Sequence, residues 1–186
     1  MTDTSTLDDV GLLEGIVDRI ATSLSMLIDR DIEIEGLSAE RVHERAAGAG
    51  TVHISFKLVF LKDGEEMGNG SVLVPLADAI AMACYLMMLD DSEVTGHRAA
   101  SELDESTKDA LVELASFVAT AVDESIRIHH PDVAVRSRGC QGVRADVRPA
   151  FPYEEGSELL VGRARASVHE FPEFELILMM PPLPGS

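Results

Sequence analysis

The segment from Ala77 to Leu89 constrains the fold more than any other part of the chain, because it is apolar almost all round. A helix on a protein surface has one apolar stripe, whereas a helix of this composition is packed on both sides. The apolar run starts at Leu73, but Pro75 and Asp78 interrupt it, and it is shorter than the roughly 20 residues needed to cross a bilayer. We therefore expect a strand followed by a buried helix, with Leu86 to Leu89 filling the core.

Two amphipathic helices are expected on either side of this segment, at about Asp8 to Asp29 and about Asp104 to Ile128. In both stretches apolar residues recur every three or four positions, the spacing of one helix face. The apolar positions are Leu12, Ile16, Ile20, Leu24 and Leu27 in the first and Leu111, Leu114, Val118, Val122 and Ile126 in the second. The opposite side of the second helix carries Asp109, Glu113, Ser116, Thr120, Asp123 and Glu124.

Alternation of polar and apolar residues, or short apolar runs between turns, predicts about six strands. Asp63-Gly64 is a hairpin signal between the second and third of them. The arginine-rich stretch from Arg136 to Arg148 has no clear pattern. The expected strands are 31–35, 52–61, 71–76, 132–136, 159–169 and 174–180.

These elements predict a mixed α+β domain, with an antiparallel-rich sheet, two long helices and one buried shorter helix. A chain of 186 residues fits one domain, which we place at residues 9–184 after a flexible tail at residues 1–8. A long helix followed by an alternating strand occurs near each end, and aligning the two junctions places Glu14 against Ser116. Both a pseudo-two-fold internal repeat and a chance similarity are compatible with this pattern.

The formal charge of −18, from 33 acidic and 15 basic residues, argues against nucleic acid or an anionic membrane as the partner, since both require clustered basic side chains. The first residues have neither the basic nor the apolar region of a secretory signal, so we expect a cytoplasmic protein. Cys84 and Cys140 lack metal-ligand spacing and are expected as free thiols. The pair His129-His130 has no third ligand at a useful spacing, so no metal site is expected.

A family resemblance enters through the second long helix. Leu103 to Glu105 followed by Asp109 to Val118 resembles the signature helix of the CheC/CheX/FliY chemotaxis phosphatases, in which acidic and small residues lead into E-x-x-N on an exposed face. Gly70 to Val74 before a buried helix, and the closing strand Phe174 to Met180, are also similar to that family. The resemblance covers most of the chain.

The resemblance implies that Glu113 and Ser116 form the catalytic positions, and that Asp109, Glu113 and Thr120 bind the partner. The partner would be a phosphorylated CheY-like response-regulator receiver domain. In the family the acidic residue grips a lysine beside the phospho-aspartate and the Asn amide positions the attacking water, while the receiver supplies Mg²⁺. The chain would then need no cofactor of its own.

Ser116 departs from the family pattern, because it occupies the position of the Asn. A serine hydroxyl is shorter than an amide and lacks its separate donor and acceptor. The first helix has Gly11 and Glu14 at the corresponding positions, so a single site is expected, as in CheX-like proteins, which also implies a homodimer. Three functions remain open: an aspartyl-phosphate phosphatase, a catalytically silent regulator-binding or switch-complex module, and a small-molecule-sensing domain with an apolar interior cavity.

Overall fold

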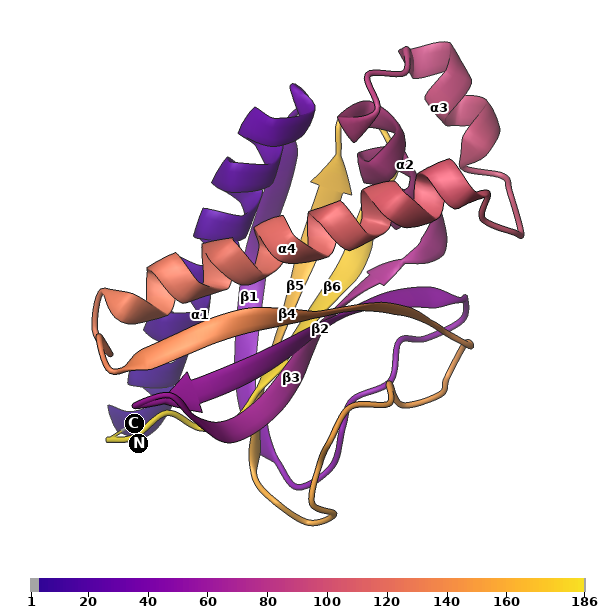
Figure 1. Cartoon of the computed structure of the whole chain (residues 1–186). Helices are drawn as coiled ribbons and strands as arrows, with labels where there is room; N and C mark the ends of the chain where they lie inside the picture. The colour runs from indigo at the N-terminus through magenta and orange to yellow at the C-terminus, as the bar shows by residue number, and fades with distance from the viewer. Residues whose placement is uncertain (1–3, 186) are drawn as a thin grey trace.

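The computed structural model describes residues 4–185 and contains one antiparallel sheet with helices on one of its faces (Figure 1). The helices are α1 (Thr4–Ile28), α2 (Leu76–Leu86), α3 (Asp91–His97) and α4 (Glu105–Arg127). The strands are β1 (Ile32–Val42), β2 (His53–Lys62), β3 (Glu65–Pro75), β4 (Val133–Val143), β5 (Leu159–Val168) and β6 (Phe174–Met180).

The sheet has the order β1-β5-β6-β3-β2-β4, and every neighbouring pair is antiparallel. The first half of the chain, with α1, β1, β2 and β3, and the second half, with α4, β4, β5 and β6, occupy equivalent places in this order. Each long helix, α1 or α4, leads into an edge strand, β1 or β4, which pairs with the first strand of the other half's hairpin. The topology therefore has the pseudo-two-fold form of an internal repeat, and the predicted α+β class is confirmed.

The hairpin between β2 and β3 turns where the sequence predicts it. Lys62 pairs with Glu65 across a two-residue loop. Asp63 and Gly64 both have positive φ, 51° and 84°. These angles are typical of a type I′ turn, whose twist matches that of the strands.

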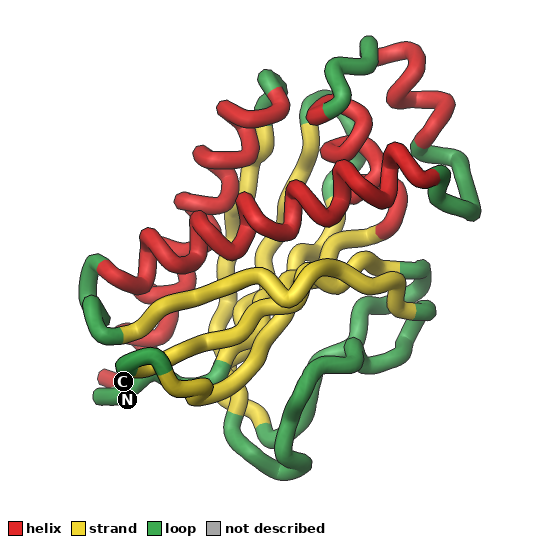
Figure 2. Tube along the Cα trace, viewed as in Figure 1, coloured by secondary structure: helices red, strands yellow, loops and turns green. Residues whose placement is uncertain are grey.

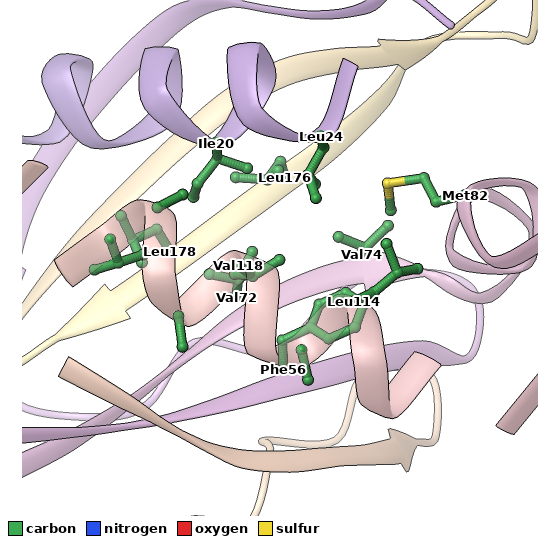
Figure 3. Close-up of a cluster of buried hydrophobic side chains, with 14 of the residues drawn as sticks. Ile20, Leu24, Phe56, Val72, Val74, Met82, Leu114, Val118, Leu176 and Leu178 are labelled. Atoms are coloured by element: carbon green, nitrogen blue, oxygen red, sulfur yellow. The ribbon is translucent and has the colours of Figure 1, made fainter. Parts of the chain in front are cut away.

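The main core lies between the sheet and the layer formed by α1, α2 and α4. Alternate residues of β2, among them Phe56 and Phe60, point toward the helices because successive strand side chains face opposite sides of a sheet. Figure 3 shows Phe56 near Val72 and Val118, with Ile20 and Leu24 of α1 on the other side of the cluster. Every residue of α2 from Asp78 to Tyr85 is buried, which confirms that this helix is packed on more than one side.

The second face of the sheet is partly covered by irregular chain, the loops 43–52 and 144–158. Figure 2 shows these loops side by side (green), and the Asp146 amide donates to the Gly48 carbonyl at 2.9 Å. They enclose a smaller apolar cluster, formed by Leu73, Val143, Phe151, Leu159, Val161, Ile177 and Met179. The sequence does not predict this cover, because the loops have no periodic pattern.

Several predicted boundaries are wrong. The helix α2 ends at Leu86, and Met88 is 92% exposed with a φ of 64° rather than filling the core. The connector after it contains α3, which is held by a capping box at Asp90. The unassigned stretch from Arg136 is strand as far as Val143. The expected tail, residues 1–8, overlaps the start of α1 from Thr4, and residues 1–3 lie outside the described residues.

Candidate functional site

The helix α4 carries the predicted site, and one hydrogen bond caps its start while another joins its last turns to β4. At its start the Asp104 carboxylate accepts from the Thr107 amide at 2.7 Å, as an N-cap does. The hydrogen bond to the Thr107 amide lowers the pKa of Asp104 below its usual value. Near its end Asp123 accepts from the Val135 amide at 2.7 Å, which ties α4 to the edge strand β4.

One face of α4 is buried against the core and the other is open to solvent, as the apolar spacing predicts. Figure 1 shows α4 crossing in front of α1 and of the strands β1, β5 and β6. Asp109, Glu113, Ser116 and Thr120 are all exposed. Because residues three or four apart share a helix face, these four side chains form one outward stripe, called the α4 stripe below.

The acidic residues of the α4 stripe are uncommitted within the part of the chain that the structure describes. No hydrogen bond or ion pair there involves the carboxylate of Asp109 or Glu113. Lys108, the nearest cation on the same helix, pairs instead with Glu105 at 2.9 Å. The α4 stripe therefore presents two negative charges to solvent without an internal counter-charge.

The hydroxyls of the α4 stripe turn back toward their own helix. The Ser116 Oγ lies 3.5 Å from the Val112 carbonyl oxygen, at the outer limit of a hydrogen bond. The Thr120 hydroxyl donates to the Ser116 carbonyl at 2.9 Å. Both follow the common pattern of helical Ser and Thr bonding to the preceding turn, so Ser116 does not project away from the helix as a longer amide would.

Two exposed apolar side chains, which are not among the site residues expected from the sequence, lie beside the α4 stripe. Val112 is 53% exposed and Phe117 is 37% exposed. Each lies next to a stripe residue in sequence, Glu113 or Ser116. The sequence already indicates that both side chains face outward, since neither falls on the buried apolar spacing defined by Leu111, Leu114 and Val118.

The corresponding surface of α1 has a different character. Gly15 faces α4, and a Cβ added there would lie in ordinary van der Waals contact with the Ser125 hydroxyl, at 3.5 Å. A cleft of about 260 Å³ runs between the two helices, with Gly11 and Gly15 on one side and Ile128 and His129 on the other. Gly11 offers no carboxylate, so α1 has no acid three residues before Glu14.

The other candidates from the sequence do not assemble into a site. Among the described residues, no group of three or more His, Cys, Asp or Glu side chains could hold a metal ion. Arg136 pairs with Asp123, Arg138 with Glu66 and Arg148 with Glu44, so three members of the arginine-rich stretch form ion pairs within the chain.

Both cysteines are free thiols, as expected, and burial raises the pKa of Cys84 to about 11. Cys84 is therefore protonated and unreactive at neutral pH.

The apolar interior offers little space for a ligand. The cavity lined by Ile20, Leu24, Met82, Val118 and other core residues has a volume of about 20 Å³. A space of that size holds about one water molecule. This geometry does not support the small-molecule-sensing alternative at this position.

No helix within residues 4–185 combines the length and the apolar character that a membrane crossing needs.

Comparison with known proteins gives similarity in structure only. A scan against models of known families finds no match. A search of curated proteins finds no significant relative. Among solved structures, FliY from Thermotoga maritima superposes with a TM-score of 0.72 at 16% identity, over 97% of this chain and 91% of that one.

Two further solved structures extend the likeness. A chain of the FliG–FliM complex from H. pylori gives a TM-score of 0.71 at 10% identity, over 97% of this chain and 94% of that chain. The chemotaxis protein CheX from Desulfovibrio desulfuricans gives 0.57 at 12% identity, over 91% and 98%. The two long helices, the buried α2 and the six-stranded antiparallel sheet identify this chain as a protein with the fold shared by CheC, CheX, FliY and the FliM middle domain.

Proposed function

We propose that the chain binds a phosphorylated CheY-type receiver domain through the α4 stripe and hydrolyses its acyl phosphate slowly or not at all. The observation that carries this proposal is the exposed Glu113 carboxylate, which has no partner among the described residues, on the solvent-facing side of α4. A carboxylate in that position can meet a cationic group of a partner without first breaking an internal ion pair.

The hydrolytic step depends on the side chain three residues after Glu113, which is Ser116. Phosphoryl transfer to water needs a group that positions the water, while Mg²⁺ on the receiver neutralises the phosphoryl oxygens. Ser116 supplies a hydroxyl that lies close to the Val112 carbonyl. Its short reach supports binding in preference to efficient turnover.

The experiment is a titration of this chain against each CheY-type receiver domain of the source genome, charged with acetyl phosphate and Mg²⁺. The proposal predicts saturable binding to one phosphorylated receiver and weaker binding to its unphosphorylated form. Phosphate release is followed in the same mixtures and is expected to stay near the receiver's own decay. Absence of binding to every charged receiver would overturn the proposal.

A second candidate is a scaffold within a flagellar switch complex, and the TM-score of 0.71 to a chain of the FliG–FliM complex favours it. A scaffold would bind a structural partner with the same affinity whether or not any receiver is phosphorylated. Pull-down with and without acetyl phosphate separates the two candidates, because only receiver binding through the α4 stripe responds to the phosphoryl group.

We also infer that the chain acts in the cytoplasm as a homodimer that joins through the sheet. The strands β1 and β4 form the two edges of the sheet, and an edge strand has unpaired backbone groups that a second copy can meet. Light scattering is expected to give twice the mass of 20.0 kDa. A mass equal to one chain at micromolar concentration would contradict the dimer.

A further inference from the structure

Val112 and Phe117 are large apolar side chains on the open face of a helix whose other outward positions are polar or charged. Val112 is 53% exposed and Phe117 is 37% exposed. A single exposed apolar residue is common on protein surfaces and needs no explanation. Here two of them border the same pair of site residues, Glu113 and Ser116, so their placement around the helix is informative.

Val112 lies on the side of α4 that faces β4. It precedes Asp123 by eleven residues, which is about three helical turns, so the two side chains leave the helix in nearly the same direction. The Asp123 carboxylate accepts from the Val135 amide of β4 at 2.7 Å. The direction of Asp123, and therefore that of Val112, is toward this edge of the sheet.

Phe117 lies on the opposite side of α4, toward α1. It precedes Glu124 by seven residues, which is about two turns, so these side chains also share a direction. The Glu124 carboxylate lies 3.7 Å from the Arg19 guanidinium of α1. At about 100° per residue around a helix, Phe117 lies about 40° to one side of Glu113 and Val112 about 100° to the other, with Ser116 between Glu113 and Val112. The α4 stripe therefore runs between the two apolar side chains.

We propose that Val112 and Phe117 are partner-binding residues and that the receiver domain docks astride α4, with apolar contacts on both sides of a cationic group that meets Glu113. This inference rests on the proposed function of the same site. Apolar contacts around a central ion pair exclude water from it, and the lower local dielectric strengthens the attraction between the charges.

The charges on α4 favour a partner whose docking surface has a basic group at its centre, and Val112 and Phe117 favour apolar side chains around that group. The chain carries a net charge of −18, and Lys108 is already paired with Glu105 at 2.9 Å. The free charges at Asp109 and Glu113 are thus complementary to a cation. A partner that instead entered the cleft between α1 and α4, where Ile128 and His129 lie, would reach the α1 side of the helix and leave Val112 in water.

The test measures the dissociation constant for the phosphorylated, Mg²⁺-loaded receiver that binds the unmodified chain. Val112→Ala is expected to weaken binding about fivefold and Phe117→Ala about tenfold or more, because each removes apolar area that becomes buried in the complex. The matched controls are Ile128→Ala, at a position 64% exposed just beyond the end of α4, and Met26→Ala, at a position 80% exposed on α1. Both controls are expected to stay within about twofold of the unmodified chain.

A charge variant keeps the test valid if Phe117→Ala fails to fold. Val112→Lys places a cation beside the incoming basic group and, at a position 53% exposed, leaves the core untouched. It is expected to weaken binding more than Val112→Ala does.

The outcomes separate this inference from the proposed function. Binding that is lost in Glu113→Ala but unchanged in both Val112 and Phe117 variants overturns the inference and leaves the proposed function standing. If Phe117→Ala weakens binding and neither Val112 variant does, the receiver does not contact both sides of α4, and the proposed docking geometry is overturned. No binding of the unmodified chain to any receiver overturns both.

Discussion

The Ser116 hydroxyl lies 3.5 Å from the main-chain carbonyl oxygen of Val112, one helical turn earlier. It stands three residues after Glu113, where the resembling family has an amide. The position of the hydroxyl close to its own helix gives a physical reason to expect weak hydrolysis from a site whose other parts are exposed and available.

Replacing this residue by Ser116→Asn is expected to raise the rate of receiver dephosphorylation at least about tenfold above that of the unmodified chain. The amide reaches farther from the helix and separates its donor from its acceptor, so it can hold a water molecule. The measurement is release of inorganic phosphate from the charged receiver. Thr120→Asn is the matched control, because it places the same amide one turn farther along the α4 stripe. Equal rates for both variants would contradict the assignment.

The buried ion pair between Arg98 and Asp78 is expected to hold α3 against α2. Asp78 is 5% exposed, its carboxylate accepts from the Arg98 guanidinium at 2.8 Å, and that guanidinium stacks 4.1 Å from the centre of the Phe171 ring. Arg98→Ala leaves a buried carboxylate without its partner and is expected to cost about 3 kcal/mol of unfolding free energy. Chemical denaturation measures this cost, and the double variant Arg98→Ala with Asp78→Ala should recover part of it. A loss below about 1 kcal/mol would contradict the role of the pair.

The stability cost of Arg98→Ala is expected to grow with pH. Burial raises the pKa of Asp78 above its ordinary value of 3.8, and the Arg98 guanidinium opposes that rise. A carboxyl whose pKa is raised in the folded state stabilises the fold below its unfolded pKa, and this contribution is lost as the pH rises through the folded pKa. Because Arg98→Ala removes the opposing guanidinium, the pKa of the Asp78 carboxyl rises further in that variant. The stability difference from the unmodified chain should widen as the pH rises above about 4, and a difference that does not change with pH would contradict this prediction.

Two glycines are expected to respond in opposite ways to alanine. A Cβ added at Gly70 would lie 2.1 Å from the Met179 carbonyl oxygen and 3.1 Å from the Phe60 ring. Gly70→Ala should therefore separate β3 from β6 and lower the melting temperature by more than about 10 °C or prevent folding. At Gly11 no neighbouring atom lies within 4 Å. Gly11→Ala is expected to stabilise α1 by about 0.5–1 kcal/mol, and a destabilised Gly11→Ala would contradict the open helix face.

Much of the fold follows from local patterns in the sequence, because those patterns have a direct physical basis. The spacing of Leu111, Leu114 and Val118 fixes the buried side of α4, and the Asp63-Gly64 pair fixes the β2–β3 turn. The exposed stripe of α4 follows as the complement of the buried one. The side chains predicted for the site thus lie together on one surface, although their function stays a prediction.

The features that the sequence does not predict depend on tertiary context. Met88 is apolar like a core residue, but α2 ends before it and the chain turns outward into α3. The second half of β4 has no alternating pattern because a bulge interrupts its pairing with β2 between Ser137 and Cys140, where Gly139 has a φ of 79°. The sequence indicates that Val112 and Phe117 face outward, but only the contacts of Asp123 and Glu124 show that one lies toward β4 and the other toward α1.

The dissociation constant of Glu113→Ala for the phosphorylated receiver shows whether the exposed carboxylate of α4 binds the receiver. The matched control is Glu124→Ala, which removes the same charge from the same helix, at a carboxylate that faces Arg19. If Glu113 meets a cationic group of the receiver, Glu113→Ala weakens binding at least about tenfold, equivalent to about 1.4 kcal/mol, while Glu124→Ala changes it less than about threefold. Equal effects of the two variants, or unchanged binding of Glu113→Ala, would contradict a receiver-binding site on α4.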